Sequence, residues 1–348
     1  MERAEHIGSG NWTSAPATPV ASTRRFAAVL IGLALVSLVL AGWLPLPFSV
    51  VTVFLFAGPH NWFELRYFIS RLPARLGRSR NFFIVAFSGI GVLTLGYAAI
   101  PFFGYRWWWS GGTWLTAAAT WNTAALLWVA ALVVIRGRQT PRRDWNWAIP
   151  AACFLIAANW MAPAWFGLAL VYLHPLVALW FLDRHLGRVR PEWQRTYRRC
   201  LAVLPVLIGV LWWNLAGTAS LASDGEVAGR ITTHAGSGLL PQVSSHLLVS
   251  THVFLETLHY GVWLLAIPLI RSSGSPTAET PWNLISIPLM RHPRGWPVAI
   301  TLVIAVGAVV MLILWAGFSL DYARTRDIYF TVALAHVLAE VPFLLRTV

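Results

Sequence analysis

The sequence contains little charge, and least of all negative charge. Charged residues make up 11% of the 348 residues, with 13 aspartates and glutamates against 26 arginines and lysines. The apolar fraction is 57% and the mean hydropathy is +0.62. A soluble domain of this length carries more charge on its surface, so the composition excludes a large soluble fold and indicates an integral membrane protein.

Cysteine is also scarce, and several common catalytic motifs are absent. The two cysteines, Cys153 and Cys200, lie in or beside apolar runs and cannot define a disulfide framework. The sequence has no phosphate-binding glycine loop, no Cys-x-x-Cys-His motif for covalent haem and no Gly-x-Ser-x-Gly elbow. The function must therefore rest on other residue types.

The net charge of +13 does not indicate nucleic acid, because the arginines lie in short loops between apolar runs. They follow every second run, at positions 66–80, 136–143, 184–199 and 271–294. By the positive-inside rule these loops and both chain termini are cytoplasmic. Four arginines fall on the opposite side and are exceptions to this pattern: Arg106, Arg230, Arg324 and Arg326.

The apolar runs predict an all-α, polytopic bundle of about ten transmembrane helices. Most runs approach the ~20 residues that cross a bilayer. The expected spans are 26–43, 48–69, 82–103, 114–135, 145–160, 163–182, 200–216, 246–270, 298–319 and 328–345. Residues 1–23 are polar and predict a disordered cytoplasmic tail, and residues 24–348 a single domain in a bacterial cytoplasmic membrane. The loop at 217–245 predicts either a lid or a linker.

Three of the few acidic residues interrupt apolar runs, and each follows a histidine by four positions. The pairs are His60 and Glu64, His252 and Glu256, and His336 and Glu340. A spacing of four places both side chains on one helix face. Because an ionisable group inside a membrane is costly, each pair indicates a functional site. The alternative is a purely structural role, in which the side chains form a hydrogen bond that holds two helices together.

Two further histidines, His174 and His259, lie in the same set of spans. These spans run in one direction, and counting from their external ends places all five histidines within about 10 Å of depth. Imidazole and carboxylate groups together form the usual ligand set for iron, zinc or manganese. We therefore expect a metal centre shared by four helices, with histidine ligands and with glutamates that bind, bridge or act in catalysis. The expected ligands are His60, His174, His252, His259 and His336, and the expected catalytic carboxylates are Glu64, Glu256 and Glu340. The other five histidines are expected to be solvated: His6, His185, His234, His246 and His292.

The segment Gly58-Pro59-His60-Asn61-Trp62-Phe63-Glu64 resembles the membrane-embedded bacterial carotene-cleaving oxygenases of the Brp/Blh type. That family carries a Pro-His-Gly-x-x-Asp motif and further membrane histidines that bind iron. Pro59, His60 and Glu64 match it, while Asn61 replaces the glycine and Glu64 the aspartate. The resemblance covers one motif. It implies a non-haem iron oxygenase that acts on a long isoprenoid.

Two other function classes remain open from the sequence. A b-type haem or haem-copper redox protein also places histidines on alternate spans, although paired histidines are lacking here. A proton- or metal-coupled transporter also places histidine and glutamate at the membrane midplane, although no inverted repeat is evident. The favoured reading is a non-haem iron oxidoreductase. Its lipophilic substrate would enter from the bilayer, and its partners would be membrane lipids rather than nucleic acid.

Overall fold

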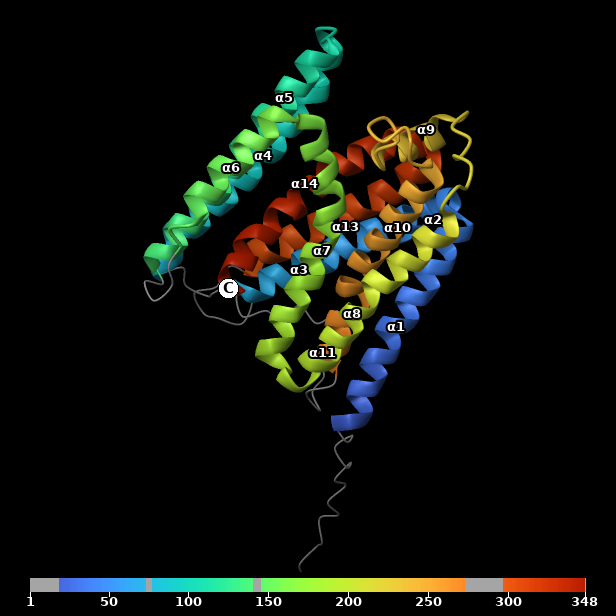
Figure 1. Cartoon of the computed structure of the whole chain (residues 1–348). Coiled ribbons are helices and arrows are strands. Elements are labelled where there is room, and N and C mark those ends of the chain that lie inside the picture. The colour runs from blue at the N-terminus through green and yellow to red at the C-terminus, as the bar shows by residue number, and fades with distance from the viewer. Residues whose placement is uncertain (1–18, 73–76, 140–144, 273–296, 348) are drawn as a thin grey trace, which may run out of the picture.

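The chain is an all-helical membrane protein over the part that the structure covers. The computed structural model describes residues 19–72, 77–139, 145–272 and 297–347, and every regular element in these ranges is a helix (Figure 1). Eight helical segments are long and apolar enough to cross a membrane. They are Thr23–Trp43, Arg80–Arg106, Gly111–Gln139, Pro163–Val189, Pro191–Leu215, Ser245–Ile270, Pro297–Leu320 and Tyr322–Arg346. The expected membrane-embedded helical bundle is thereby confirmed.

The two remaining expected spans have a different construction. The run 48–69 is built by three consecutive elements: α2 (Pro45–Thr52), the π-helix η1 (Val53–Ala57) and α3 (Gly58–Arg71). The run 145–160 corresponds to α6 (Ala148–Met161), which has only 14 residues. The count of ten spans therefore stays a prediction. Of the expected tail 1–23, residues 1–18 lie outside the described residues, and residues 19–23 belong to helix α1 (Pro19–Trp43).

Prolines mark where several helices begin. Proline lacks a backbone N–H and has a helical φ, so it is well suited to the first turn of a helix. Pro45 begins α2 one residue after α1 ends, Pro163 begins α7 (Pro163–Val189), and Pro191 begins α8 (Pro191–Leu215). These short breaks join neighbouring helices through one residue and so favour adjacent packing of sequential helices.

Helix α10 (Ser245–Gly261) forms the centre of the bundle. It continues through the π-helix η3 (Val262–Ala266) into α11 (Ile267–Ser272). In this continuous segment 72% of the most apolar stretch is buried, against 17–35% in the other seven candidate spans. Helices α1, α2, α7 and α8 pack around α10. Helices α4 (Arg80–Arg106), α5 (Gly111–Gln139) and α6 form a layer at one side, which α14 (Tyr322–Thr347) joins to the rest (Figure 1).

The carboxyl ends of four expected spans meet at one end of the bundle. The Arg346 guanidinium donates to the carbonyl of Arg71 at 3.2 Å, and that of Arg188 donates to the carbonyl of Arg346 at 3.4 Å. Arg136 donates to the carbonyl of Leu345 at 3.3 Å. Spans 48–69, 114–135, 163–182 and 328–345 therefore run in the same direction. Which membrane side holds this end stays a prediction.

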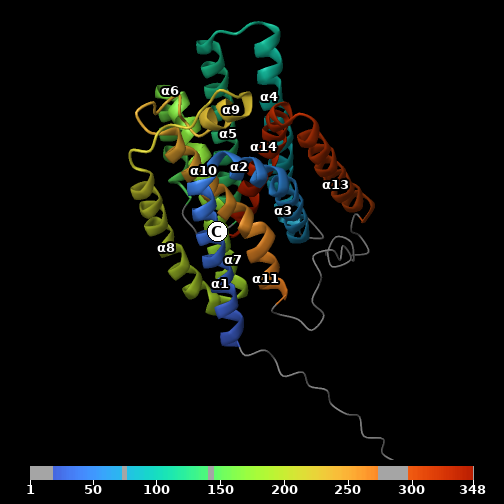
Figure 2. The same cartoon turned by 90° about the vertical axis from the view of Figure 1, so that its right-hand side faces the viewer.

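The segment 217–245 lies at the opposite end of the bundle from the α7–α8 turn (Figures 1 and 2). It contains a short helix, α9 (Glu226–His234). Arg230 of α9 forms ion pairs with Glu226 and with Asp327 of α14, and nearby Ile231 is buried in a small core with Leu248 and Val249 of α10. The segment is therefore a folded cap on α10 and α14 rather than a plain linker.

Candidate metal centre

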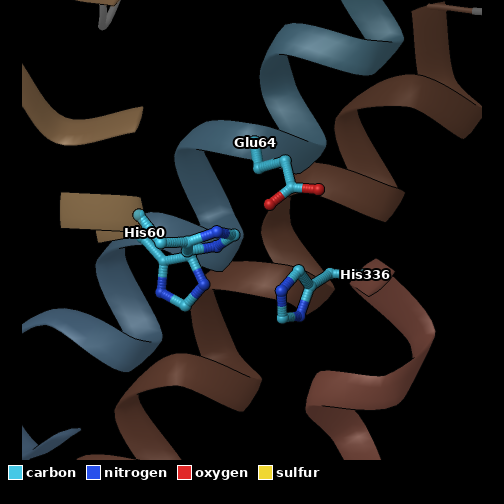
Figure 3. A group of neighbouring side chains, drawn as sticks. His60, Glu64 and His336 are labelled. Carbon is cyan, nitrogen blue, oxygen red and sulfur yellow. The ribbon is translucent and has the colours of Figure 1, made fainter. Parts of the chain in front are cut away.

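Four helices bring most of the expected site residues together. His60 and Glu64 lie on α3, His174 on α7, His259 on α10, and His336 and Glu340 on α14. Figure 3 shows His60, Glu64 and His336 pointing toward a common space. Helix α14 contacts both α3 and α7, and α10 contacts α7. The expectation that these four helices are neighbours agrees with the structure.

The imidazole rings of the four histidines form a closed circuit. The ring centroids of His60 lie 5.4 Å from His259 and 5.1 Å from His336. The ring of His174 completes the circuit, 4.7 Å from His259 and 5.5 Å from His336. At these distances each imidazole ring contacts two others, so the ring nitrogens of the four histidines lie in one small volume.

Two groups of possible ligand atoms overlap within this volume. One contains His60, Glu64, His259 and His336, and the other contains His174, His259 and Glu340. Within each group the ligand atoms lie within 4.8 Å of one another. Ligands about 2.0–2.2 Å from one ion are separated by roughly 3–4 Å, so a modest contraction would bring each group to bonding geometry. His259 belongs to both groups.

The orientation of His60 is set by local structure. Its Nδ1 atom lies 3.0 Å from the carbonyl oxygen of Phe56, which places the proton on Nδ1. The lone pair of Nε2 is then available to a ligand, as in metal-binding histidines whose other nitrogen donates to a backbone carbonyl. Phe56 belongs to η1, and η3 begins three residues after His259. Single π-helical turns occur frequently at functional sites.

Most residues of the centre are deeply buried, and several of their polar atoms have no hydrogen-bond partner in the part of the chain that the structure describes. Glu64 and His60 are 0% exposed, His259 is 2% and Glu340 is 3% exposed. Both carboxylate oxygens of Glu64 and both ring nitrogens of His259 are buried with no hydrogen-bond partner among the described residues. The nearest ionic contact is between His174 Nδ1 and Glu340 Oε2, at 3.6 Å. Buried polar atoms almost always have a partner, so these carboxylate and imidazole groups could hold a cation.

His252 and Glu256 were expected in the same centre, but they lie apart from these two ligand groups. The ring of His252 packs edge-on against Tyr172 of α7 and His234 of α9. Glu256 accepts a hydrogen bond from Tyr260 at 2.7 Å and lies 3.9 Å from His252 Nδ1. The helical spacing predicts the shared face correctly, but two turns of α10 carry His252 away from His259.

Three histidines expected to be solvated have specific partners. His185 is 5% exposed and its Nδ1 lies 3.0 Å from the Tyr67 hydroxyl. His246 Nε2 lies 2.9 Å from the carbonyl oxygen of Gly42. His234 is half-buried between His252 and Phe330. The solvated reading is therefore wrong for these three, because long-range contacts cover residues that a loop or helix-end position suggests are exposed. His6 and His292 lie outside the described residues.

Two buried asparagines, Asn122 and Asn159, join neighbouring helices through hydrogen bonds. The amide of Asn122 donates to the side-chain oxygen of Asn159 at 2.9 Å. Asn159 in turn donates to the carbonyl of Ala119 at 2.8 Å. This network joins α5 to α6, neither of which contributes to the two ligand groups. Tyr260 also lies beside the centre, with its ring 4.3 Å from that of His60.

Comparison with known proteins gives no relative from which a role can be transferred. No protein-family model matches the chain, and no curated protein or solved structure matches it. The chemistry of the site must therefore be argued from its own residues.

Proposed function

We propose that this protein is a membrane-embedded metalloenzyme whose centre binds two neighbouring metal ions, with non-haem iron as the metal that the donor set fits best. His60, Glu64 and His336 would hold one ion, and His174 and Glu340 the other. His259 lies in both groups and would contribute an imidazole ligand to the pair. The donor set is imidazole and carboxylate without thiolate, which is typical of non-haem iron centres.

The observation that carries this proposal is the set of orphaned donor atoms. A buried carboxylate or imidazole without a partner destabilises the fold, yet α3, α10 and α14 each contribute at least one such group to a single cluster. Helix α7 adds His174 to the same cluster. If these positions only packed helices together, apolar side chains would stabilise the contact more than ionisable ones. The ring-to-ring distances of 4.7–6.0 Å leave room for single ions between imidazoles and favour a non-haem centre over a flat porphyrin.

Bound iron would supply dioxygen activation, and the residues around it would determine what reacts. The neighbouring walls are apolar: Val53, Ala57 and Phe318 line the adjoining core together with Tyr260. Such walls exclude bulk water and favour a lipophilic substrate that enters from the bilayer. The resemblance of the Pro59-His60-x-x-x-Glu64 segment to carotene-cleaving oxygenases makes a long isoprenoid the first substrate class to test.

The test is elemental analysis of the purified protein combined with absorption spectroscopy. We expect close to two equivalents of iron and no Soret band. A Soret band with one haem per chain would replace the non-haem proposal, and a protein free of any transition metal would leave the cluster with a structural role. His246→Gln is a matched control on α10, because its ring binds a backbone carbonyl and lies outside both ligand groups.

The shared position of His259 gives a sharper prediction about nuclearity. His60→Gln and His174→Gln each remove a ligand from a different group, so each should lower the metal content to about half. His259→Gln should reduce both sites at once. Metal content per folded chain, measured after size-exclusion chromatography, distinguishes these cases. Complete loss in all three variants would indicate one mononuclear centre instead.

A further inference from the structure

A row of polar side chains leads from the α9 cap toward the metal centre. We call His234, His252, Glu256 and Tyr260 the polar row. The rings of His234 and His252 are 5.1 Å apart, and His252 Nδ1 lies 3.9 Å from a carboxylate oxygen of Glu256. Tyr260 donates to the other oxygen of Glu256 at 2.7 Å, and its ring lies 4.3 Å from the ring of His60. The row thus forms a series of successive contacts from the cap to the ring of His60.

One wall of the polar row is a buried arginine on α14. Arg326 is 6% exposed, and its guanidinium lies over the ring of Phe330 at 4.5 Å. Phe330 in turn stacks on His234. The Nε atom of Arg326 and the hydroxyl of Tyr322, one turn earlier, are buried with no hydrogen-bond partner among the described residues. A buried guanidinium donor needs a partner, so a polar species must lie beside this wall.

The charges around the wall indicate that this species is water rather than an anion. Two cations, Arg230 and Arg326, interact with three carboxylates, which belong to Glu226, Glu256 and Asp327. The negative groups already outnumber the positive ones, so an added anion would be repelled. Water has no charge and satisfies donors and acceptors together, as buried waters do in other proteins.

His234 is suited to the mouth of such a passage. It is half-buried at the end of α9, the segment that caps the bundle. Burial, together with the nearby His252 and Arg326, keeps its pKa well below the ordinary value. The ring is therefore neutral near pH 7, with one nitrogen that donates and one that accepts. A neutral imidazole can pass a proton between waters on its two sides without holding a fixed charge.

We propose that the polar row is a hydrated entrance through which water and protons reach the metal centre from the α9 end of the molecule. The role of this entrance rests on the proposed function, since reduction of dioxygen consumes protons and the walls around the centre are apolar. The presence of the entrance is independent of that function, because the polar row and its wall consist of residues outside the two ligand groups. Glu256 supplies the carboxylate of the row, and the Tyr260 hydroxyl holds it in place.

Hydroxyl-radical footprinting with mass spectrometry tests the entrance directly, because radicals generated from bound water oxidise the side chains beside it. The protein is purified in lipid nanodiscs with whatever metal it carries. We expect His252 and Tyr260 to be oxidised severalfold faster than Tyr67 and Tyr197, which are also buried but lie away from the row. Equal, slow oxidation of both sets would show that the row is dry and overturn the proposal.

A variant at the mouth provides the second test. His234→Leu replaces the imidazole with an apolar group of similar size, and should slow the oxidation of His252 and Tyr260 severalfold without changing that of Tyr197. His246→Leu is the matched control, since His246 lies at the same end of the bundle but contacts Gly42. Unchanged oxidation at His252 in His234→Leu would rule out the α9 end as the entry side. Neither measurement requires a metal, so metal-free protein would defeat the proposed function while leaving the entrance testable.

Discussion

At the scale of single residues, the buried carboxylates are the most informative feature. Glu64 and Glu340 are both buried, and neither Glu64 oxygen has a hydrogen-bond partner among the described residues. Two carboxylates in one apolar volume repel each other and lose their hydration. Without a metal these carboxylates therefore lower the free energy of unfolding, and a bound cation would restore it.

Glu64→Gln should separate the effect of this carboxylate on stability from its effect on metal binding. The amide keeps the shape and removes the charge, so chelator-treated protein should become more stable, by about 1–3 kcal/mol. The same variant should bind less metal, because an amide oxygen is a weaker ligand than a carboxylate. Thermal unfolding in detergent after chelation, with metal analysis before it, gives both quantities.

Glu226→Gln is the control for that comparison. Glu226 pairs with Arg230 on the exposed side of α9, and exposed ion pairs contribute about 0–1 kcal/mol. Its unfolding temperature and metal content should stay close to those of the unmodified protein. Lower stability of metal-free Glu64→Gln would contradict an unpaired buried carboxylate at this position.

At the scale of helices, tryptophans packed against glycines determine how closely neighbours approach. A Cβ atom added at Gly89 of α4 would lie 1.9 Å from the indole nitrogen of Trp128 on α5. That indole is held by a hydrogen bond to the carbonyl of Val85 at 2.9 Å, so it cannot move without losing a buried partner. The absence of a side chain at Gly89 thus permits the α4–α5 contact.

Gly89→Ala should therefore destabilise the protein by about 1–3 kcal/mol through overpacking. Gly91→Ala, on the same helix, is a matched control because a Cβ there meets nothing within 4 Å. That change should be neutral or stabilising by up to about 1 kcal/mol, since alanine favours helix more than glycine. Unfolding temperatures of the two variants, measured side by side, test the contact. Equal values would show that α4 and α5 do not pack as described.

At the scale of the whole molecule, the two ends of the bundle differ in character. The ends of α3, α5, α7 and α14 meet through arginine–carbonyl hydrogen bonds at one end. The α9 cap and the mouth of the polar row lie at the other (Figure 2). If the arginine-rich end is cytoplasmic, as the positive-inside rule predicts, the entrance opens to the external side.

Cysteine labelling tests this orientation. In a background where Cys153 and Cys200 are replaced by serine, Ser223→Cys should react with an impermeant thiol reagent in intact cells. Arg195→Cys should react only after the cells are opened. Both positions are exposed, so reagent access through the membrane is the only difference. The opposite pattern would invert the topology, and labelling of both positions in intact cells would contradict a membrane crossing by α8, which lies between them.

The sequence by itself determined the fold class and most of the candidate centre. Apolar runs of membrane length leave only helices as a stable structure, because backbone groups in lipid must bond within their own segment. The four-residue spacing of His60 and Glu64, and of His336 and Glu340, likewise determines a shared helix face whatever the packing. Depth counted from the external ends of the spans then placed the five histidines within about 10 Å of one level.

Only the tertiary structure decided which residues at that level meet. His252 and His259 share one face of α10, so spacing alone does not distinguish them. The level at which α10 is packed in the bundle brings His259 beside His60 of α3, whereas His252, two turns away, meets His234 of the α9 cap. The roles of His234 and Arg326 depend on the folding of the 217–245 segment over α10 and α14, a contact between residues about a hundred positions apart. Helical periodicity describes neighbours along one helix, whereas such contacts depend on the packing of several helices at once.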